Sequence, residues 1–269
     1  MPKCLIWSPK VTLSSRTERH TGCEGCRNHT LATPHKGPRV ARVKLRDGLN
    51  LFAPNRCLGC RQLGEGPLCA LCIAEAPWKF PIAEEGSRIG GLSDCLTLLW
   101  MEGIAVDWIH RFKYPEPGRL GFDGPAKALA LHLGSLLGQE IDASQHDEVM
   151  PIPLSRRRLR TKGFNPAATL AHAIFRNSPA TLQTRALQRI RDTPPQAGLG
   201  FRARQLNVEG AFYFRPSARR PLPLRVWLVD DVRTTGATLA AAAETLRAAG
   251  VQDVIGVGLA QTRWRTTTG

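Results

Sequence analysis

The sequence has 269 residues, of which 42% are hydrophobic, enough for one large domain and a small one. The absence of any run of about eighteen apolar residues excludes a membrane-spanning helix, and the apolar start, Met1 to Leu13, is too short and interrupted for a signal peptide. The net charge of +15 favours an acidic partner, either nucleic acid or a polyphosphate, unless it reflects only an arginine-rich composition.

Residues 1–50 are polar and basic and show no sustained hydrophobic periodicity, which predicts a disordered extension. The segment contains one Cys-x-x-Cys pair, which would need further ligands to form a second metal site; the candidates are Cys23 and Cys26 with His20, His29 or Cys4. These spacings fit no compact metal-binding pattern. An over-extended reading frame would give the same kind of segment.

Two further Cys-x-x-Cys pairs, Cys57 with Cys60 and Cys69 with Cys72, are separated by eight residues. Two such pairs can place four thiolates tetrahedrally around Zn²⁺. A module this short, predicted over residues 51–82, buries too little apolar surface to fold alone, so a structural zinc ion would supply its folding energy. Two disulfides are the alternative, which the lack of an export signal disfavours.

From Asp147 onward the predicted elements alternate between strands and helices, so residues 92–265 are predicted to form an α/β domain with a largely parallel sheet covered by helices. Hydrophobic patterns predict strands at 96–100, 148–154, 226–229 and 251–260, and helices at 105–114, 125–138, 166–176 and 239–249. Asn165 is predicted to cap the third of these helices, and Pro166 to open it.

A cationic segment follows the second predicted strand, and we expect it to form a loop. It contains Ser155, Arg156, Arg157, Arg158, Arg160 and Lys162. Cations gathered at the carboxyl end of a strand suit a highly charged anion such as pyrophosphate, with Ser155 and Arg156 as candidate contacts. A solvated basic face is the alternative. Residues 189–212 are polar and cationic, and we expect a lid or β-hairpin there, in which Arg202 or Arg204 supplies charge.

The strand at 226–229 leads into Asp230, Asp231 and the loop Thr234-Thr235-Gly236-Ala237-Thr238, before the last predicted helix. The first N–H groups of a helix and a hydroxyl-lined loop favour a phosphate. Gly236 lets the backbone approach closely, and the two carboxylates can accept hydrogen bonds from vicinal sugar hydroxyls. The alternative is an Asp-Asp turn that binds nothing.

This stretch resembles the ribose-5-phosphate loop of type I phosphoribosyltransferases. The resemblance implies that Asp230 and Asp231 hold the 2′ and 3′ hydroxyls of phosphoribosyl pyrophosphate (PRPP). It also implies that Thr234 to Thr238 hold the 5′-phosphate and that Mg²⁺ accompanies the pyrophosphate. The expected fold is therefore a type I phosphoribosyltransferase-like sheet, preceded by a zinc knuckle.

Taken in order, the motifs from about Phe52 to Arg263 resemble the ComF family of competence-associated proteins. They are the paired cysteines, Ile109-His-Arg-Phe-Lys-Tyr114, Pro151-Ile-Pro-Leu with Lys162-Gly-Phe-Asn165, the Gln196…Arg204…Asn207 segment ending in Gly-Ala-Phe212, and the Asp-Asp loop. Two positions depart from the family pattern: Lys162 replaces an arginine, which removes a bidentate donor, and Pro166 replaces a glutamine.

The resemblance implies a cytoplasmic role in natural transformation, with single-stranded DNA and competence proteins as partners; some relatives are linked instead to sugar-acid uptake. Three hypotheses follow. The chain is a transferase that displaces pyrophosphate from PRPP, a non-catalytic adaptor for single-stranded DNA, or a regulator gated by PRPP. No catalytic base or nucleophile is indicated by the sequence.

Overall fold

The computed structural model describes residues 56–63, 67–79, 83–85, 89–114, 125–192, 208–218 and 220–263, with only the backbone described at 83–85, 125 and 126. All of them belong to one compact unit that begins at Arg56. The expected extension at 1–50, its cysteine pair, Arg202 and Arg204 lie outside the described residues. The boundary expected between a knuckle at 51–82 and a domain at 92–265 stays a prediction.

A six-stranded sheet, in the order β1-β2-β8-β7-β3-β4, forms the centre of this unit, and all its neighbours are parallel except the β1–β2 pair. Its strands are β1 (Ala83–Glu85), β2 (Asp94–Trp100), β3 (Glu148–Pro151), β4 (Thr181–Leu182), β7 (Arg225–Arg233) and β8 (Asp253–Gln261). A separate antiparallel pair joins β5 (Leu187–Arg189) to β6 (Phe212–Phe214). The expected mostly parallel sheet is confirmed.

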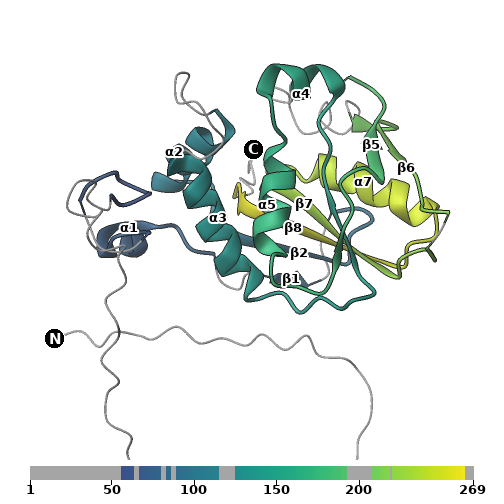
Figure 1. Cartoon of the computed structure of the whole chain (residues 1–269), viewed down its shortest axis with the longest axis horizontal. Coiled ribbons are helices and arrows are strands. Elements are labelled where there is room, and N and C mark those ends of the chain that lie inside the picture. The colour runs from purple at the N-terminus through teal and green to yellow at the C-terminus, as the bar shows by residue number, and fades with distance from the viewer. Residues whose placement is uncertain are drawn as a thin grey trace, which may run out of the picture. The chain divides into compact units, whose positions relative to one another are not determined.

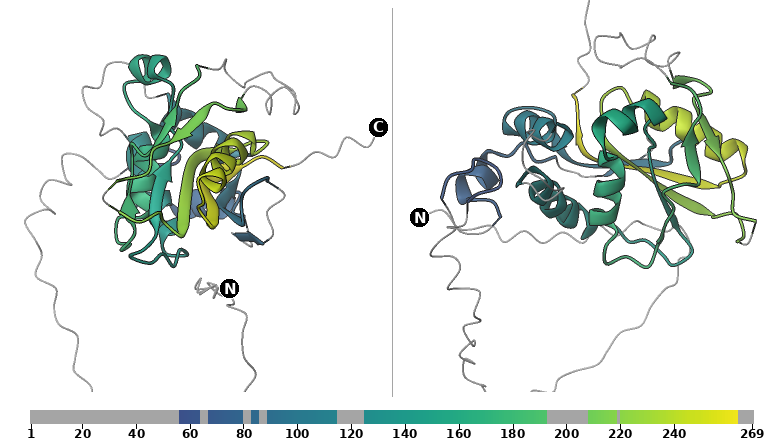
Figure 2. Two further views of the ribbon diagram at one scale, coloured as in Figure 1. Left: turned by 90° about the vertical axis from the view of Figure 1, so that its right-hand side faces the viewer. Right: turned by 45° about the horizontal axis from the view of Figure 1, so that its top comes forward.

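The described helices are α1 (Ala70–Glu75), α2 (Ile104–Lys113), α3 (Pro125–Gly138), α4 (Arg156–Lys162), α5 (Pro166–Ile174) and α7 (Ala237–Ala248). Helices α3 and α5 lie on one face of the sheet and α7 on the other, as the side view in Figure 2 shows. In Figure 1, α1 lies beside α2, on the far side of the molecule from α7. No helix in the described ranges is long and apolar enough to cross a membrane.

Strand β7 is buried on both faces because side chains alternate along it. Trp227 and Val229 pack into the core shared with α3 and α5, whereas Val226 and Leu228 pack into the core shared with α7. All four side chains are fully buried. This explains why the apolar run in the sequence is continuous rather than alternating, as expected for a central parallel strand.

The cationic segment after β3 was expected to be a loop, and that expectation is wrong because it forms α4. The Ser155 hydroxyl oxygen accepts a hydrogen bond from the Arg158 N–H (3.3 Å), which caps the first turn, and Gly163 ends the helix in the left-handed conformation. Arg, Leu and Lys between these caps have good helix propensity. Asn165 and Pro166 start α5 as expected, with the Asn165 side-chain oxygen accepting from the Ala167 N–H (3.1 Å).

Helices α3 and α5 approach closely where α3 carries glycine. A Cβ added at Gly134 would lie 2.9 Å from the Ala173 Cβ, and one at Gly138 would lie 2.2 Å from the Ile174 carbonyl oxygen. The second contact involves backbone, which cannot rotate away as a side chain can. The position of α5 against the sheet therefore depends on the absence of a side chain at Gly138.

We expect Gly138→Ala to lower the free energy of unfolding by about 1–3 kcal/mol, because the overlap outweighs the better helix propensity of alanine. Thermal or urea denaturation of the purified chain measures this. Ser135→Ala, at an exposed position of the same helix, is the control and should change stability little. Equal stability of Gly138→Ala and wild type would mean that α3 and α5 can separate at no cost.

Candidate functional site

A cavity of about 900 Å³ lies at the carboxyl edge of the sheet, where β3 and β7 end side by side. The chain leaves β3 toward α4 and α5, and leaves β7 toward α7 on the opposite face. Loops that diverge in this way open a crevice at the point where the strand order reverses, the usual ligand position in open α/β sheets. The cavity volume is within the range of small-molecule sites.

The predicted acid pair lines this cavity. Asp230 and Asp231 are partly buried in the last part of β7, which ends at Arg233, and the Asp230 carboxylate accepts a hydrogen bond from the Asp231 N–H (2.8 Å). The Asp231 carboxylate lies 3.2 Å from the Lys113 ammonium group, and its side chain is only 14% exposed. Burial, and then the charge of Asp231, raise the pKa of Asp230 to about 7, while Lys113 acts in the opposite direction.

The predicted phosphate loop also lines the cavity, through Thr234, Gly236, Ala237 and Thr238. Gly236 has a φ of 78° and is the N-cap of α7, and a Cβ there would lie 2.6 Å from the Ile89 side chain. The Thr235 hydroxyl accepts a hydrogen bond from the Ala237 N–H (3.3 Å). The amino end of α7 therefore lies at the cavity, and the amino end of a helix favours an anion.

Cationic side chains also line the cavity. Altogether six Lys or Arg side chains and three Asp side chains line it; the cations are Lys113, Arg157, Arg158, Lys162, Arg189 and Arg233. Ser155 is buried as the cap of α4 and Arg156 is exposed, and neither is among the lining residues. Contact of Ser155 or Arg156 with a ligand stays a prediction.

Lys113 and Tyr114 belong to this site, although sequence reasoning did not place them there. They come from the end of α2, more than a hundred residues before the acid pair. The Lys162 ammonium lies 4.9 Å from the centre of the Tyr114 ring and 5.8 Å from that of Phe164, and burial lowers the pKa of Lys162. The only available signal was the motif from Ile109 to Tyr114, which does not reveal what its side chains contact.

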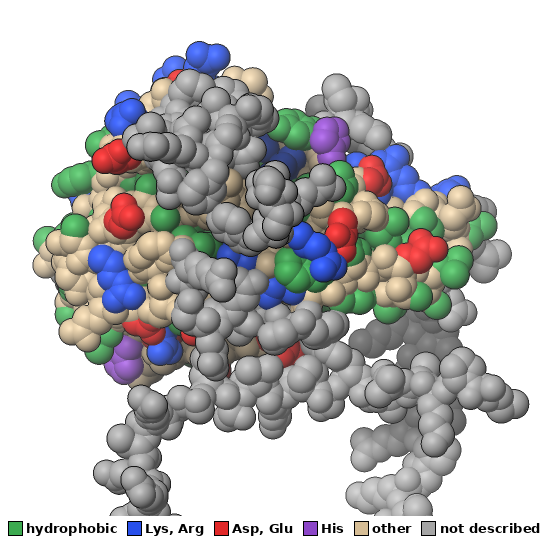
Figure 3. All heavy atoms as spheres, turned by 180° about the vertical axis from the view of Figure 1, so that it is seen from behind, with side chains coloured by type: hydrophobic (Ala, Val, Ile, Leu, Met, Phe, Trp, Pro, Cys, Tyr) green, Lys and Arg blue, Asp and Glu red, His purple; other side chains and the backbone are tan. Residues whose placement is uncertain are grey.

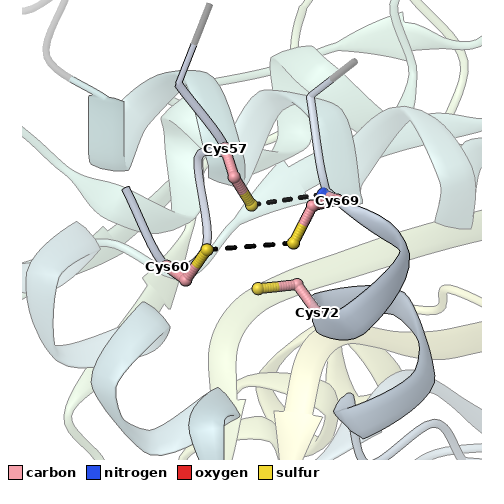
Figure 4. A group of neighbouring side chains, drawn as sticks. All are labelled: Cys57, Cys60, Cys69 and Cys72. Atoms are coloured by element: carbon pink, nitrogen blue, oxygen red, sulfur yellow. Dashed lines mark hydrogen bonds between the residues drawn. The ribbon is translucent and has the colours of Figure 1, made fainter. Parts of the chain in front are cut away.

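The four cysteines expected to bind zinc come together. Figure 4 shows their sulfur atoms converging, from the turn at Cys57–Cys60 and from the start of α1, and all four lie within 4.8 Å of one another. The sulfurs of Cys60 and Cys69 are 3.8 Å apart, which is too long for a disulfide and about the edge of a tetrahedron with Zn–S bonds of about 2.3 Å. The cluster can hold a metal ion such as zinc.

The surroundings of the sulfurs also suit a metal. Burial raises the pKa of the Cys57 thiol, but backbone N–H donors of Cys69, Cys60 and Gly59 outweigh it and lower the pKa to about 6. The Cys69 N–H lies 3.2 Å from the Cys57 sulfur. Burial raises the pKa of Cys72, so a metal must displace that proton. Donors aimed at a sulfur stabilise a thiolate, the form in which cysteine binds metal.

The face shown in Figure 3 has no single basic patch among its visible side chains. On the face shown in Figure 3, the visible Lys and Arg side chains lie at several separate places, with acidic side chains among them. The net charge of +15 is thus not gathered into one patch on that visible surface.

The fold and these two sites define an α/β protein with a mostly parallel sheet, a charged cavity at the carboxyl edge and an attached four-cysteine metal knuckle. No family model matches the chain. It is 33% identical over 223 residues to competence protein F of Haemophilus influenzae, covering 81% of this chain and 96% of that protein. The DNA utilization protein YhgH of Salmonella typhi is 31% identical over 224 residues, covering 73% of this chain and 92% of that protein.

Competence protein ComFC of Streptococcus pneumoniae is 28% identical over 162 residues, covering 58% of this chain and 69% of that protein. Among solved structures, TT1426 from Thermus thermophilus covers 52% of this chain and 86% of its own, at 15% identity, but its TM-score of 0.29 is too low to support any conclusion. The chain belongs to the ComF family, because its identity to competence protein F extends over nearly the whole of that protein.

We expect the purified chain to carry about one zinc ion, and Cys57→Ser/Cys60→Ser to lose it, because two thiolates cannot complete a tetrahedral site. Metal analysis by mass spectrometry measures this. Cys95→Ala is the control, since Cys95 is buried in the other core, next to β8. Equal metal content in the double variant and wild type would exclude the cluster as the metal site.

The pKa of Asp230 predicts a pH effect on stability. Because this pKa rises from 3.8 to about 7 on folding, the folded chain binds more protons than the unfolded chain between these pH values. The contribution of this group to the free energy of unfolding therefore falls as the pH rises through that window. Asp230→Asn should remove this decrease in the free energy of unfolding, because asparagine does not titrate.

We expect Asp230→Asn to be more stable than wild type at pH 8, and by a margin about 2–3 kcal/mol larger than at pH 5, since the window from pH 5 to the pKa spans roughly two units of about 1.4 kcal/mol each. Urea denaturation of the ligand-free proteins at both pH values gives the two margins. Identical margins would contradict a raised pKa at Asp230.

Proposed function

We propose that this ComF-family chain binds PRPP with Mg²⁺ in the cavity at the carboxyl edge of the sheet, and that it serves competence or DNA uptake. The observation that carries the ligand is one cavity that holds an acid pair, a helix-capping glycine loop and a cationic wall. The printed names of the relatives, two competence proteins and a DNA utilization protein, support the process. A cytoplasmic location follows from this proposal and stays a prediction.

Each part of the cavity suits one part of PRPP. Asp230 and Asp231 accept hydrogen bonds from the ribose hydroxyls, and the loop Thr234 to Thr238 binds the 5′-phosphate with its N–H groups and hydroxyls. Arg157, Arg158 and Lys162 line the same cavity and bind the pyrophosphate. Mg²⁺ bound with the substrate would neutralise part of the pyrophosphate charge. Ser155, Arg156, Arg202 and Arg204 remain candidate contacts on that side.

The acid pair argues against a site for a simple polyanion. Two adjacent carboxylates repel phosphate, so their presence in a cationic cavity needs a ligand with hydrogen-bond donors as well as negative charge. A phosphorylated sugar has both. The zinc ion proposed for Cys57, Cys60, Cys69 and Cys72 has a structural role, because four cysteine ligands leave no open position for substrate.

A non-catalytic role in binding single-stranded DNA is the second candidate. It is favoured by the net charge of +15 and by the name of the Salmonella typhi relative. Counterion release would make such binding fall steeply with salt. If PRPP binds but no acceptor reacts with it, the chain is a regulator that PRPP gates, and the zinc knuckle and basic surface would engage DNA or competence proteins.

We expect Asp230→Asn/Asp231→Asn to weaken PRPP binding at least about tenfold, because losing two charge-assisted hydrogen bonds exceeds the roughly 1.4 kcal/mol that this factor needs. Isothermal titration calorimetry with PRPP and Mg²⁺ measures the affinity, and ribose 5-phosphate should show the same loss. Pyrophosphate alone should bind the variant as well as wild type, because it has no sugar.

Asp192→Asn is the matched control, since it removes a negative charge from the same cavity without touching the acid pair. Its affinity for PRPP should equal or exceed that of wild type. Wild-type protein that binds single-stranded DNA but no PRPP would reject the proposed ligand and place the DNA-binding role first.

A further inference from the structure

Helix α2 contacts the cysteine knuckle along one side. The Arg111 guanidinium donates a hydrogen bond to the Gly59 carbonyl oxygen (2.6 Å), in the turn between Cys57 and Cys60. Gly59 is packed between the knuckle and α2. A Cβ added there would lie 2.8 Å from the Cys72 sulfur and 2.9 Å from the Trp108 ring. The conformation of the metal-binding turn and the position of α2 are therefore tied together.

The same helix ends at the cavity. The Lys113 ammonium lies 3.2 Å from the Asp231 carboxylate, and the Phe112 ring meets the Phe164 ring edge-on, with centroids 6.3 Å apart. Residues 111 and 113 point about 200° apart around a helix. Arg111 therefore reaches the knuckle while Lys113 reaches the acid pair, and α2 lies between the two sites.

A displacement of α2 at the knuckle would reach Lys113 because the helix is a rigid body. Its apolar side, Trp108, Ile109 and Phe112, is buried in the core that also contains Cys57 and Cys72. Such packed elements move as units rather than deforming locally. In the described part of the knuckle there is one six-residue helix and few buried apolar side chains, so we expect its order to depend on the metal.

Lys113 in turn favours the ionised form of the acid pair, which is the form that accepts hydrogen bonds. Two adjacent, partly buried carboxylates tend to retain a proton, and a protonated carboxyl group loses acceptor capacity. The cations whose charges act on the pair come from α2, α4 and β5: Lys113, Lys162 and Arg189. Of these, Lys113 forms an ion pair with Asp231 at 3.2 Å.

We propose that Lys113 is a positioning residue of the cavity, and that the metal-loaded knuckle holds it on Asp231 through Arg111 and helix α2. Metal loading thereby sets the affinity for a sugar phosphate without supplying a ligand to it. The inference rests on the proposed function, since it assigns a regulator to the same cavity, and it identifies α2 as the element shared by the two sites.

Calorimetry with PRPP and Mg²⁺ on the full chain tests this, before and after zinc is removed with a chelator. Wild type should lose about tenfold in affinity on zinc removal, a factor within the usual range for coupled sites. Lys113→Met should bind about tenfold more weakly than wild type with zinc present, and zinc removal should then change its affinity less than about twofold. Such non-additivity is the mark of two groups that act through one another.

Arg111→Met keeps all four cysteines, so it should retain zinc and still lose affinity for PRPP. This variant tests the inference even if removing zinc unfolds the chain. Arg263→Met is the matched control, because Arg263 pairs with Glu102, just before α2, without touching the knuckle or the cavity. It should bind PRPP as wild type does, with the same dependence on zinc.

Hydrogen–deuterium exchange of the ligand-free protein separates this inference from the proposed ligand. Zinc removal and Arg111→Met should each increase exchange over residues 104–113, whether or not PRPP binds. If zinc removal increases exchange in a wild-type protein that binds no PRPP, the proposed ligand is rejected but the connection between knuckle and cavity through α2 is retained. Unchanged exchange, or an equal loss of PRPP affinity on zinc removal in wild type and Lys113→Met, would overturn the inference.

Discussion

The parallel pairing of β7 with both β3 and β8 is the constraint on which the site depends. It buries Val226 to Val229 completely and fixes where their strand ends. Because β3 ends at the same edge, the acids that follow the buried run line the same cavity as the cationic helix that follows β3. Neither segment makes a site alone, and their juxtaposition produces the cavity.

The charge balance of the cavity follows from this geometry. A cationic wall alone would bind many anions without discrimination, and an acid pair alone would favour a metal ion. Together they favour a ligand with donors at one end and negative charge at the other. The ion pair between Lys113 and Asp231 compensates part of the acidic charge in the ligand-free chain, at the position where such a ligand would engage the pair.

The cysteine knuckle is not a separate appendage in the described part of the chain. Cys57, Leu68 and Cys72 share one hydrophobic core with Trp108 and Phe112, and that core continues to the helices that cover the sheet. A metal site placed in this way stabilises more than its own loop, because disorder in the knuckle would expose one side of α2. The cysteine cluster thus shares one core with helix α2, whose last residue lines the cavity.

Features that rest on short stretches of chain could be predicted from the sequence. The buried strand, the acid pair, the glycine loop and the start of α7 follow one another directly along the chain, and the cysteine spacings are equally local. Their physical causes, hydrophobic burial, backbone conformation and metal-ligand geometry, act between neighbours and therefore leave a pattern. The mostly parallel sheet followed from the alternation of such elements.

Only the tertiary structure decided which distant groups meet. Lys113 contacts Asp231 and Arg111 contacts the Gly59 carbonyl, although the members of each pair are far apart in the sequence and no hydrophobic periodicity relates them. The segment after β3 is helical because it is capped at Ser155 and Gly163. Its many charged residues favoured the interpretation as a loop, so these caps were not recognised. The raised pKa of Asp230 arises from burial and from neighbours in space, and a linear sequence specifies these only through the complete fold.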